Sequence, residues 1–394
     1  MMPLVLAAAF AAPPAVTEPC TLPDTHTPLQ VYVVSVTPGW DAMSSLGHTM
    51  VLFAGGGLSE PVTYNWGAFD ASSETVMRDF ASGELPYFLV EWSWPAMHQS
   101  LLEQGRGAVG QRLALDDAEA RAFMERLEHD PARDGYIYDW ATANCSTKAR
   151  DAIDEEFDGA LAKAWAKPVS TTPRYDVRRH LGAFVARDLA WSFIAGPEVD
   201  VPLTAWERTM FPERLLEALE GAKQADGARV VDQTCVLLPG RFQWAPERPA
   251  PTWLWSIPGL LAGWMALAAM MGKGRTAQRL LGSATVLYGL FLTGLGGSTL
   301  LVSMLTAMKG AGPTWAWALA GPQSVVLVVG GVQAWRGRSA GPWMKISLGT
   351  VLVASLVGAS LAASGLGAAF VPGILGCVIG LWRGPLSARA QSHS

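Results

Sequence analysis

The chain of 394 residues is 50% hydrophobic and only 16% charged, with a formal net charge of −5, whereas about a quarter of the residues of an ordinary soluble domain are charged. The deficit is confined to one end, because residues 251–394 contain nine Lys and Arg and no Asp or Glu. The formal charge of residues 251–394 is therefore +9, so residues 1–250 must carry a formal charge of −5 − 9 = −14. So acidic a segment argues against nucleic acid as a partner.

The first residues, MMPLVLAAAFAAPPA, combine a short apolar run with small residues suited to cleavage. We therefore expect a signal peptide over residues 1–19, with a weak N-terminal anchor as the alternative. Cys20 and Cys235 flank the acidic segment and can form a disulfide in an oxidising compartment, although the sequence does not decide whether they do. Cys377 lies in the hydrophobic tail, which leaves Cys145 as an unpaired cysteine whose presence needs a reason.

Alternating and β-branched segments predict a series of strands in the acidic half. The second and third of them are expected to pair, and the last is followed by a helix over residues 115–130, which begins with Asp residues at its positive end. The predicted strands cover residues 29–39, 48–56, 61–70, 86–94 and 108–115.

A second helix is predicted to begin at Asn144-Cys145-Ser146-Thr147, because Ala149, Ile153 and Phe157 then lie on one face. Cys145 falls in the first turn, where the helix dipole and the outward-pointing amides lower the pKa of a thiol. The same amides can hold an oxyanion. A nucleophile and a buried small hydrophobe are the two interpretations of this cysteine.

A nucleophilic thiol needs a base, and His48 is the best candidate because it opens a predicted strand among apolar neighbours. A core histidine is the alternative. Asn65, on the neighbouring predicted strand, is the candidate to orient the imidazole, with Asp70 behind it. The remaining histidines of the acidic half are His98, which is hard to place, and three that are expected on the surface, His26, His129 and His180.

The tail contains five apolar segments long enough, or nearly so, to cross a bilayer. Eight of its nine basic residues fall in connections of one parity or after the last span, and the positive-inside rule assigns those to the cytoplasm. The acidic half then lies outside and the C-terminus inside. The tail is expected to be an anchor, with presentation of lipid as the alternative. The predicted spans are 252–272, 279–307, 313–335, 344–364 and 367–382.

Several motifs of the acidic half carry a resemblance to a known family. They are Gly47-His48 with Phe53, YNWGAFD at 64–70, the stretch 106–115, the stretch 136–151 with its NCSTKARD element, and the stretch 200–212. Together they resemble the Lnb-type N-terminal periplasmic domain of bacterial lipoprotein N-acyltransferases, over nearly the whole acidic half. One departure is Ala143, where the family often has Asp.

The resemblance implies an α+β fold, a permuted papain-like (NlpC/P60-like) thiol domain, followed by an all-α multispan transmembrane domain. By residue match Cys145 would be the nucleophile and His48 the base. Cys145 would take an acyl chain from a membrane phospholipid as a thioester and pass it to the α-amine of a diacylglyceryl-cysteine lipoprotein. The expected organisation is a catalytic domain over 20–250 in the periplasm and a domain of about five helices over 251–394 in the inner membrane. No cofactor and no metal are expected, since no ligand spacing is present.

Asn144 and Arg106 are the expected substrate-binding residues. Arg106 can meet the phosphate of the donor, with a solvated face as the alternative. Tryptophans of the acidic half can line an acyl groove, although core packing is the simpler expectation for most of them. Two other functions fit the sequence: a membrane-anchored cysteine peptidase or amidase of the cell envelope, and a non-catalytic envelope receptor in which Cys145 and His48 are core residues.

Overall fold

The computed structural model describes residues 18–41, 44–182, 184–307, 314, 316–361 and 366–383. These residues form two compact units. The first contains the described residues up to 182 together with Asp200–Pro249 and Ala307, and the second contains Phe184–Val199 and the hydrophobic tail. The stretch Phe184–Val199, which the sequence analysis assigned to the catalytic domain, thus belongs to the tail unit. The predicted signal peptide lies outside the described residues, apart from Glu18 and Pro19.

An antiparallel sheet forms the centre of the first unit. Within the described residues it has seven strands in the order β6-β4-β3-β2-β1-β5-β7. All five strands predicted from alternation are present, and β2 pairs with β3 as expected. Strand β7 was not predicted and closes the edge beside β5. The bounds are β1 Gln30–Val36, β2 His48–Ala54, β3 Val62–Ala68, β4 Pro86–Ser93, β5 Ala108–Leu113, β6 Tyr136–Ile137 and β7 Val231–Leu238.

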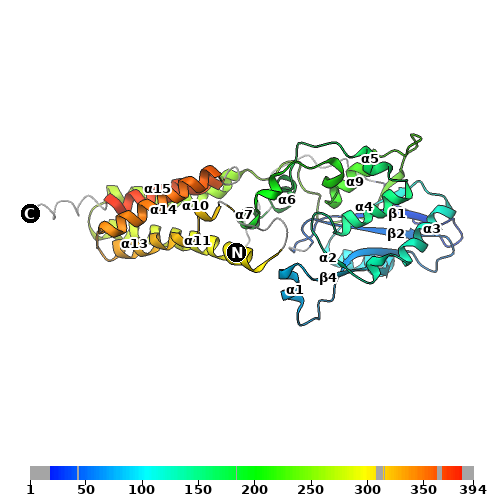
Figure 1. Ribbon diagram of the computed structural model, residues 1–394, viewed down its shortest axis with the longest axis horizontal. Helices are drawn as coiled ribbons and strands as arrows, with labels where there is room; N and C mark the ends of the chain where they lie inside the picture. The colour runs from blue at the N-terminus through cyan, green and yellow to red at the C-terminus, as the bar shows by residue number, and fades with distance from the viewer. Residues whose placement is uncertain are drawn as a thin grey trace, which may run out of the picture. The chain divides into compact units, whose positions relative to one another are not determined.

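Helices cover both faces of this sheet, because alternate residues of the central strands are buried on opposite sides (Figure 1). On one face Val51 and Phe53 of β2 pack with residues of α3, α4 and α9. On the other face Met50 and Leu52 pack with Trp94 and neighbouring residues of α2. The helices of this unit are α1 Val76–Ser82, α2 Trp94–Gln104, α3 Asp117–Glu128, α4 Cys145–Glu156, α5 Ala160–Ala164, α6 Pro173–Leu181, α8 Ala205–Arg208 and α9 Pro212–Glu220.

A disulfide joins Cys20 to Cys235 of β7. The chain before Cys20 also lies along this strand, since the Cys20 N–H donates to the carbonyl of Val236 over 2.8 Å. The bridge that the sequence permitted is therefore formed, and it fixes the N-terminal segment to the edge of the sheet. Cys145 and Cys377 are the free cysteines among the described residues.

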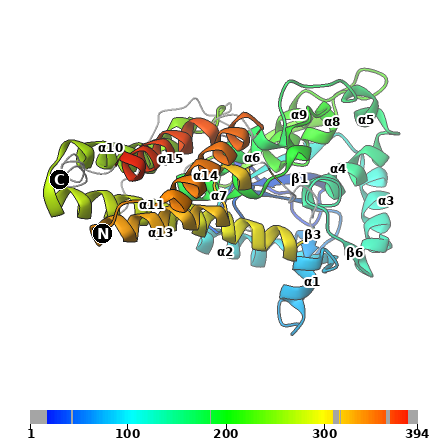
Figure 2. The ribbon, with the colours of Figure 1, turned by 60° about the vertical axis from the view of Figure 1, so that its left-hand side comes forward.

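The second unit is a group of apolar helices that run alongside one another (Figure 2). Among the described helices, four are long and apolar enough to cross a membrane, at Thr252–Met271, Gly274–Leu305, Ala316–Trp335 and Pro342–Ser360. The fifth predicted span corresponds to a shorter apolar helix, Ala369–Arg383. The helices of this unit are α7 Val185–Ile194, α10 Ile257–Met271, α11 Gly274–Leu305, α12 Ala316–Leu319, α13 Val325–Trp335, α14 Pro342–Leu361 and α15 Leu366–Arg383.

Two contacts inside this unit link helix ends that carry basic residues. Arg279 near the start of α11 lies over the ring of Trp335 at the end of α13, 5.4 Å from its centre. The indole of Trp382, one residue before the end of α15, donates to the carbonyl of Lys345 near the start of α14. The start of α11 therefore lies at the end of α13, and the start of α14 lies at the end of α15.

Candidate active site

Cys145 is the first residue of α4, and Asn144 fixes it there as the N-cap. The side-chain oxygen of Asn144 accepts from the N–H groups of Ser146 and Thr147, and the Thr147 hydroxyl accepts from the Asn144 N–H, which completes a capping box. The amide nitrogen of Asn144 donates to the carbonyls of Trp140 and Met210. Because these bonds use both hydrogens of the amide, Asn144 acts here as a residue that positions Cys145, and its side chain has no free hydrogen for the substrate.

The thiol of Cys145 is partly exposed, and its surroundings stabilise the thiolate. Burial by itself raises the pKa of this thiol, but the charge and hydrogen bond of His48 and the N–H groups of Thr49 and Ser146 outweigh it. The pKa of Cys145 therefore lies below its ordinary value. The N–H of Thr49, at the start of β2, is also placed to stabilise a negative oxygen that forms beside the sulfur. The N–H of Ser146, in the first turn of α4, already donates to the side-chain oxygen of Asn144.

His48 reaches this thiol because it is the first residue of β2, at the end of the sheet where β1 stops and β5 starts. Val36, the last residue of β1, pairs with His48 on one side and with Ala108 on the other. Gly47 makes the turn into β2 with φ +90°, and a Cβ at this position would lie 2.8 Å from the carbonyl oxygen of Val36. Any larger residue at Gly47 would therefore displace the start of the strand that carries His48.

Asn65 of β3 orients the imidazole of His48. The Nε2 atom of His48 and the side-chain oxygen of Asn65 are 3.3 Å apart. The amide nitrogen of Asn65 donates to the Thr63 hydroxyl over 2.9 Å, and this bond turns the oxygen of Asn65 toward the ring. Nε2 therefore carries the proton in this pair, which leaves Nδ1 for the thiol. Asp70 does not join this group, because it is exposed and accepts hydrogen bonds from Ser72.

The N-terminus of α4 is held by the chain around α8. The Ser146 hydroxyl donates to the carbonyl of Thr209 over 2.6 Å, next to the Met210 carbonyl that accepts from Asn144. One turn further along α4, Arg150 donates to the carbonyl of Trp206 and lies over its ring. Through these contacts the stretch 206–210 forms the surface on which the N-terminal half of α4, with Cys145 at its start, is seated.

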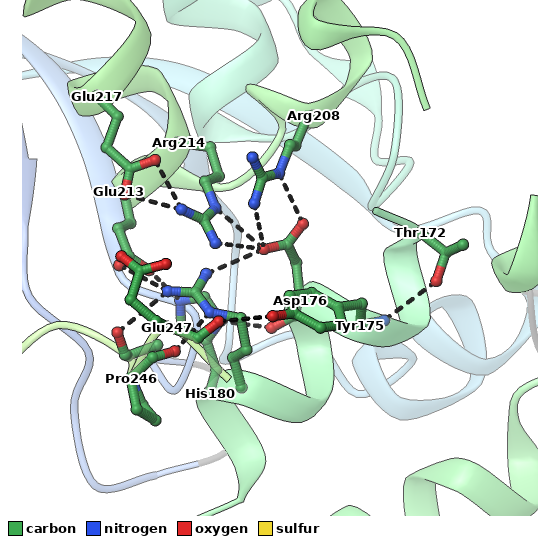
Figure 3. Close-up of polar contacts among 12 residues, drawn as sticks. Thr172, Tyr175, Asp176, His180, Arg208, Glu213, Arg214, Glu217, Pro246 and Glu247 are labelled. Carbon is green, nitrogen blue, oxygen red and sulfur yellow. Dashed lines mark hydrogen bonds and ion pairs between the residues drawn. The ribbon is translucent and has the colours of Figure 1, made fainter. Parts of the chain in front are cut away.

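A buried ion cluster fixes that stretch from its other side (Figure 3). Asp176 of α6 accepts hydrogen bonds from Arg179, Arg208 and Arg214 at 2.9–3.0 Å. Arg208 precedes Thr209 in the chain and Arg214 follows it, so this one carboxylate holds the stretch at both ends. Burial raises the pKa of Asp176, but the hydrogen bonds and charges of these arginines outweigh it and hold the pKa below its usual value.

His180 belongs to this cluster, and the expectation that it lies on the surface was wrong. Its side chain is fully buried, stacks on Phe211, and has Nε2 3.4 Å from a carboxylate oxygen of Glu213. Burial lowers the pKa of His180 to about 4 and raises that of Glu213 to about 7. Its position beside Arg178 and Arg179 in the sequence suggested solvent exposure. Arg179, however, is buried, and Asp176 and Glu213 compensate its charge.

Arg106 is buried, which excludes the solvated face that the sequence left open. It lies between the end of α2 and the start of β5, and its Nε donates to the carbonyl of Thr37 over 2.9 Å. Burial lowers the pKa of its guanidinium, and the charges of Asp41 and, to a smaller extent, of a Cys145 thiolate act in the opposite direction. Its Nη2 atom is buried without a hydrogen-bond partner among the described residues. A guanidinium with an unused donor beside a nucleophile can bind an anion.

The sequence did not predict that the carbonyls of Thr209 and Met210 and the N–H of Thr49 belong to the site, because backbone groups are the same in nearly every residue. The only sequence signal for them was that the motifs containing these residues were among those that carry the family resemblance. Among the tryptophans, Trp66 and Trp94 are buried in the core and Trp92 is exposed. Within the described residues no group of three or more His, Cys, Asp or Glu side chains is placed to hold a metal ion.

Comparison with known proteins gives a family match within the N-terminal unit. Residues 24–181 match the family described as the Lnb N-terminal periplasmic domain. The matched range contains Cys145, His48, Asn65 and Arg106 but not the stretch 200–212 on which α4 is seated. No curated protein and no solved structure matches the chain.

Proposed function

The N-terminal domain of this chain belongs to the family of Lnb N-terminal periplasmic domains, and on that premise we propose that the protein is a membrane-bound lipoprotein N-acyltransferase with Cys145 as its nucleophile. One observation carries the proposal: a thiol of lowered pKa lies in the first turn of α4, against His48 and two N–H groups. The apolar helices of the same chain suit substrates that are themselves lipids.

The reaction proceeds in two acyl transfers. The Cys145 thiolate attacks the carbonyl carbon of a phospholipid ester, and the N–H group of Thr49 stabilises the oxyanion. The C–S bond forms, the ester C–O bond breaks, and His48 gives its proton to the departing lysophospholipid alkoxide.

The second transfer regenerates the enzyme. The α-amine of a diacylglyceryl-cysteine lipoprotein attacks the thioester, the C–N bond forms and the C–S bond breaks. His48 takes the proton that the amine loses, and Cys145 returns to the thiolate. Asn65 keeps the imidazole in the required tautomer in both steps.

Arg106 is proposed to bind the phosphate of the donor. Its Nη2 atom is an unused buried donor, and such a group is costly unless a ligand satisfies it. A phosphate lies only a few bonds from the ester of a glycerophospholipid, so a guanidinium near the thiol can position that ester for attack. We assign no substrate contact to Asn144, whose amide hydrogens hold Trp140 and Met210.

We propose an inner-membrane topology with five crossings, the N-terminal domain in the periplasm and the C-terminus in the cytoplasm. The contacts of Arg279 with Trp335 and of Trp382 with Lys345 support it, because they pair the start of α11 with the end of α13 and the start of α14 with the end of α15. The last helix then returns to the basic side.

The test is mass spectrometry of the N-terminal lipopeptide of an abundant lipoprotein, in cells that lack their own lipoprotein N-acyltransferase. The matched pair of variants is Cys145→Ser and Cys377→Ser, since these are the two free cysteines of the described chain. The parent and Cys377→Ser are expected to add one acyl chain and Cys145→Ser none.

Two outcomes contradict the proposal in different ways. If the parent is inserted in the membrane and adds no acyl chain, the acyltransferase function is wrong, and a peptidase or a receptor takes its place. If Cys145→Ser adds the chain as the parent does, the function survives but the thioester mechanism does not.

A further inference from the structure

A cavity of about 350 Å³ opens at the β4–β6 edge of the sheet in the first unit. Its wall combines aromatic and aliphatic side chains with the polar residues Asp139 and Thr142; the apolar members include Phe80, Leu85, Tyr87, Ile137, Tyr138 and Trp140. Ile137 is 56% exposed although it is a large apolar side chain. Apolar side chains that line an open hollow, with a few polar groups among them, are typical of a place that a ligand covers.

The cavity lies next to the nucleophile. Ala143, which precedes Asn144 and Cys145, forms part of its wall. Tyr138 lines the cavity as well, and its pKa is raised by burial and further by the charge of Cys145. The ring of Tyr138 stacks obliquely on Tyr87, another residue of the cavity wall, with 4.7 Å between centres.

The cavity and Arg106 flank the thiol on opposite sides. Along the sheet, β4 and β6 lie on one side of β2, which carries His48, and β1 and β5 lie on the other. The cavity is formed around β4 and β6, whereas Arg106 directly precedes β5 and binds the carbonyl that follows β1. A ligand whose carbonyl carbon is held at Cys145 can therefore extend an apolar arm one way and an anionic arm the other.

We propose that this cavity binds the acyl chain that is transferred, both in the donor ester and in the thioester. The inference rests on the proposed function and names the part of the substrate that each side of the thiol recognises. Ligand cavities for whole small molecules span about 300–1,000 Å³, so a cavity of about 350 Å³ takes one chain and not both chains of a phospholipid. The glycerol and phosphate of the donor then lie toward Arg106 and can leave while the acyl chain stays in place.

This arrangement has a chemical consequence for the thioester. An acyl chain in the cavity covers Ile137 and the wall beside Tyr138, which removes water from one side of the C–S bond. Hydrolysis is then disfavoured, and the open side toward Arg106 is left for the amine of the lipoprotein. The proposal therefore explains how one thiol can favour an amine over water.

The first experiment measures how fast Cys145 of the full-length Cys377→Ser protein reacts with methyl, butyl, octyl and dodecyl methanethiosulfonates. The rate constant is expected to rise with chain length by up to roughly fourfold per methylene that enters the cavity, and then to level off. Ile137→Asp, which places a carboxylate in the wall, is expected to abolish most of this rise while the methyl reagent reacts as in the parent.

The matched control is Leu58→Asp. Leu58 lines a second cavity of about 320 Å³ with Leu29 and Met124, beside α3. This variant introduces the same charge into a cavity of similar size, and the chain-length dependence is expected to be unchanged. The methyl reagent reports on every variant whether the thiol and its surroundings are intact, so a variant that fails to fold is recognised and replaced by Ile137→Trp.

The proposal is overturned if the parent reacts with methyl and dodecyl reagents at the same rate, or if Ile137→Asp and Ile137→Trp leave the chain-length dependence as it was. These rates do not depend on acyl transfer, so they separate this inference from the proposed function. If the rate depends on chain length but no acylated lipopeptide is found, the cavity binds an apolar chain and the proposed acyltransferase function is wrong. If an acylated lipopeptide is found but the rate does not depend on chain length, the acyltransferase function stands and the assignment of the cavity is wrong.

Discussion

Polar side chains hold the N-terminal unit together around its candidate site, whereas the helices of the tail unit meet through their backbones. In the first unit Asn144, Ser146 and Arg150 attach α4 to the stretch 206–210, and Asp176 attaches that stretch to α6. In the second unit a Cβ added at Gly263 would lie 3.0 Å from the carbonyl oxygen of Pro372, and one added at Gly376 would lie 2.7 Å from the Cα of Gly263.

The difference follows from the surroundings of each unit. In water an apolar core supplies most of the stability, and buried ion pairs add specificity where their charges are compensated. In lipid the hydrophobic effect gives no preference for helix–helix contact, so close packing at small residues takes over. The buried polar groups are therefore concentrated in the unit that can compensate them.

The largest effect is expected at the site itself. His48→Gln should lower the acyl-transfer rate by about 10²–10⁴-fold, the usual contribution of a general acid–base residue. Burial raises the pKa of Cys145 and His48 counteracts it, so the variant should also require a higher pH for alkylation of Cys145 by iodoacetamide. The rate of alkylation against pH measures this shift. An unchanged profile would mean that His48 does not act on the thiol.

The next effect concerns the ion cluster. Asp176→Ala leaves Arg179 and Arg214 buried without their common carboxylate, and we expect it to destabilise the N-terminal unit by about 3–5 kcal/mol. The control is Asp232→Ala, which removes a partly exposed pair with Arg112 and should cost at most about 1 kcal/mol. Thermal unfolding of the N-terminal unit distinguishes them. Equal melting temperatures would show that the cluster does not hold the stretch 206–214.

A smaller effect is expected in the tail unit. Gly376→Val should destabilise that unit by about 1–3 kcal/mol, because the added side chain overlaps the backbone of Gly263. Gly294→Val is the control, since no atom lies within 4 Å of the Cβ that it adds. Unfolding of the protein in detergent, followed by the helical signal, measures both. If Gly294→Val is as disruptive as Gly376→Val, close backbone contact is not what holds these helices.

The smallest effect is a dependence of stability on pH. The pKa of Glu213 is raised to about 7 by burial, so its contribution to stability is present below its ordinary value of 4.5 and is lost as the pH rises through 7. The pKa of His180 is lowered to about 4 from 6.5, so its contribution grows over that range and opposes the first. Near pH 7 only the loss from Glu213 remains.

Glu213→Gln should remove that loss. The melting temperature of the parent should fall relative to the variant as the pH rises through 7. His180→Gln serves as the comparison, because it removes only the opposing contribution between pH 4 and 6.5. Parallel curves for the parent and Glu213→Gln would mean that this carboxyl titrates alike in the folded and unfolded chain.

The sequence by itself determined five strands and two helices of the first unit and the long apolar helices of the tail. Alternation placed β1 to β5, the acids at 116 and 117 marked the start of α3, and the Asn144 cap put Cys145 in the first turn of α4. Long apolar segments without acidic residues identified the tail helices. These features depend on residues within one or two turns of one another, so a linear pattern records them.

Only the tertiary structure decided which of these residues meet. The sheet order and the turn at Gly47 bring His48 to Cys145 and Asn65 to His48. The burial of Arg106 and His180, the cavity beside Tyr138 and the placement of Phe184–Val199 with the tail likewise depend on elements far apart in the chain. Such contacts are set by strand register and by which charges compensate one another after packing, and a single sequence carries no local pattern for either.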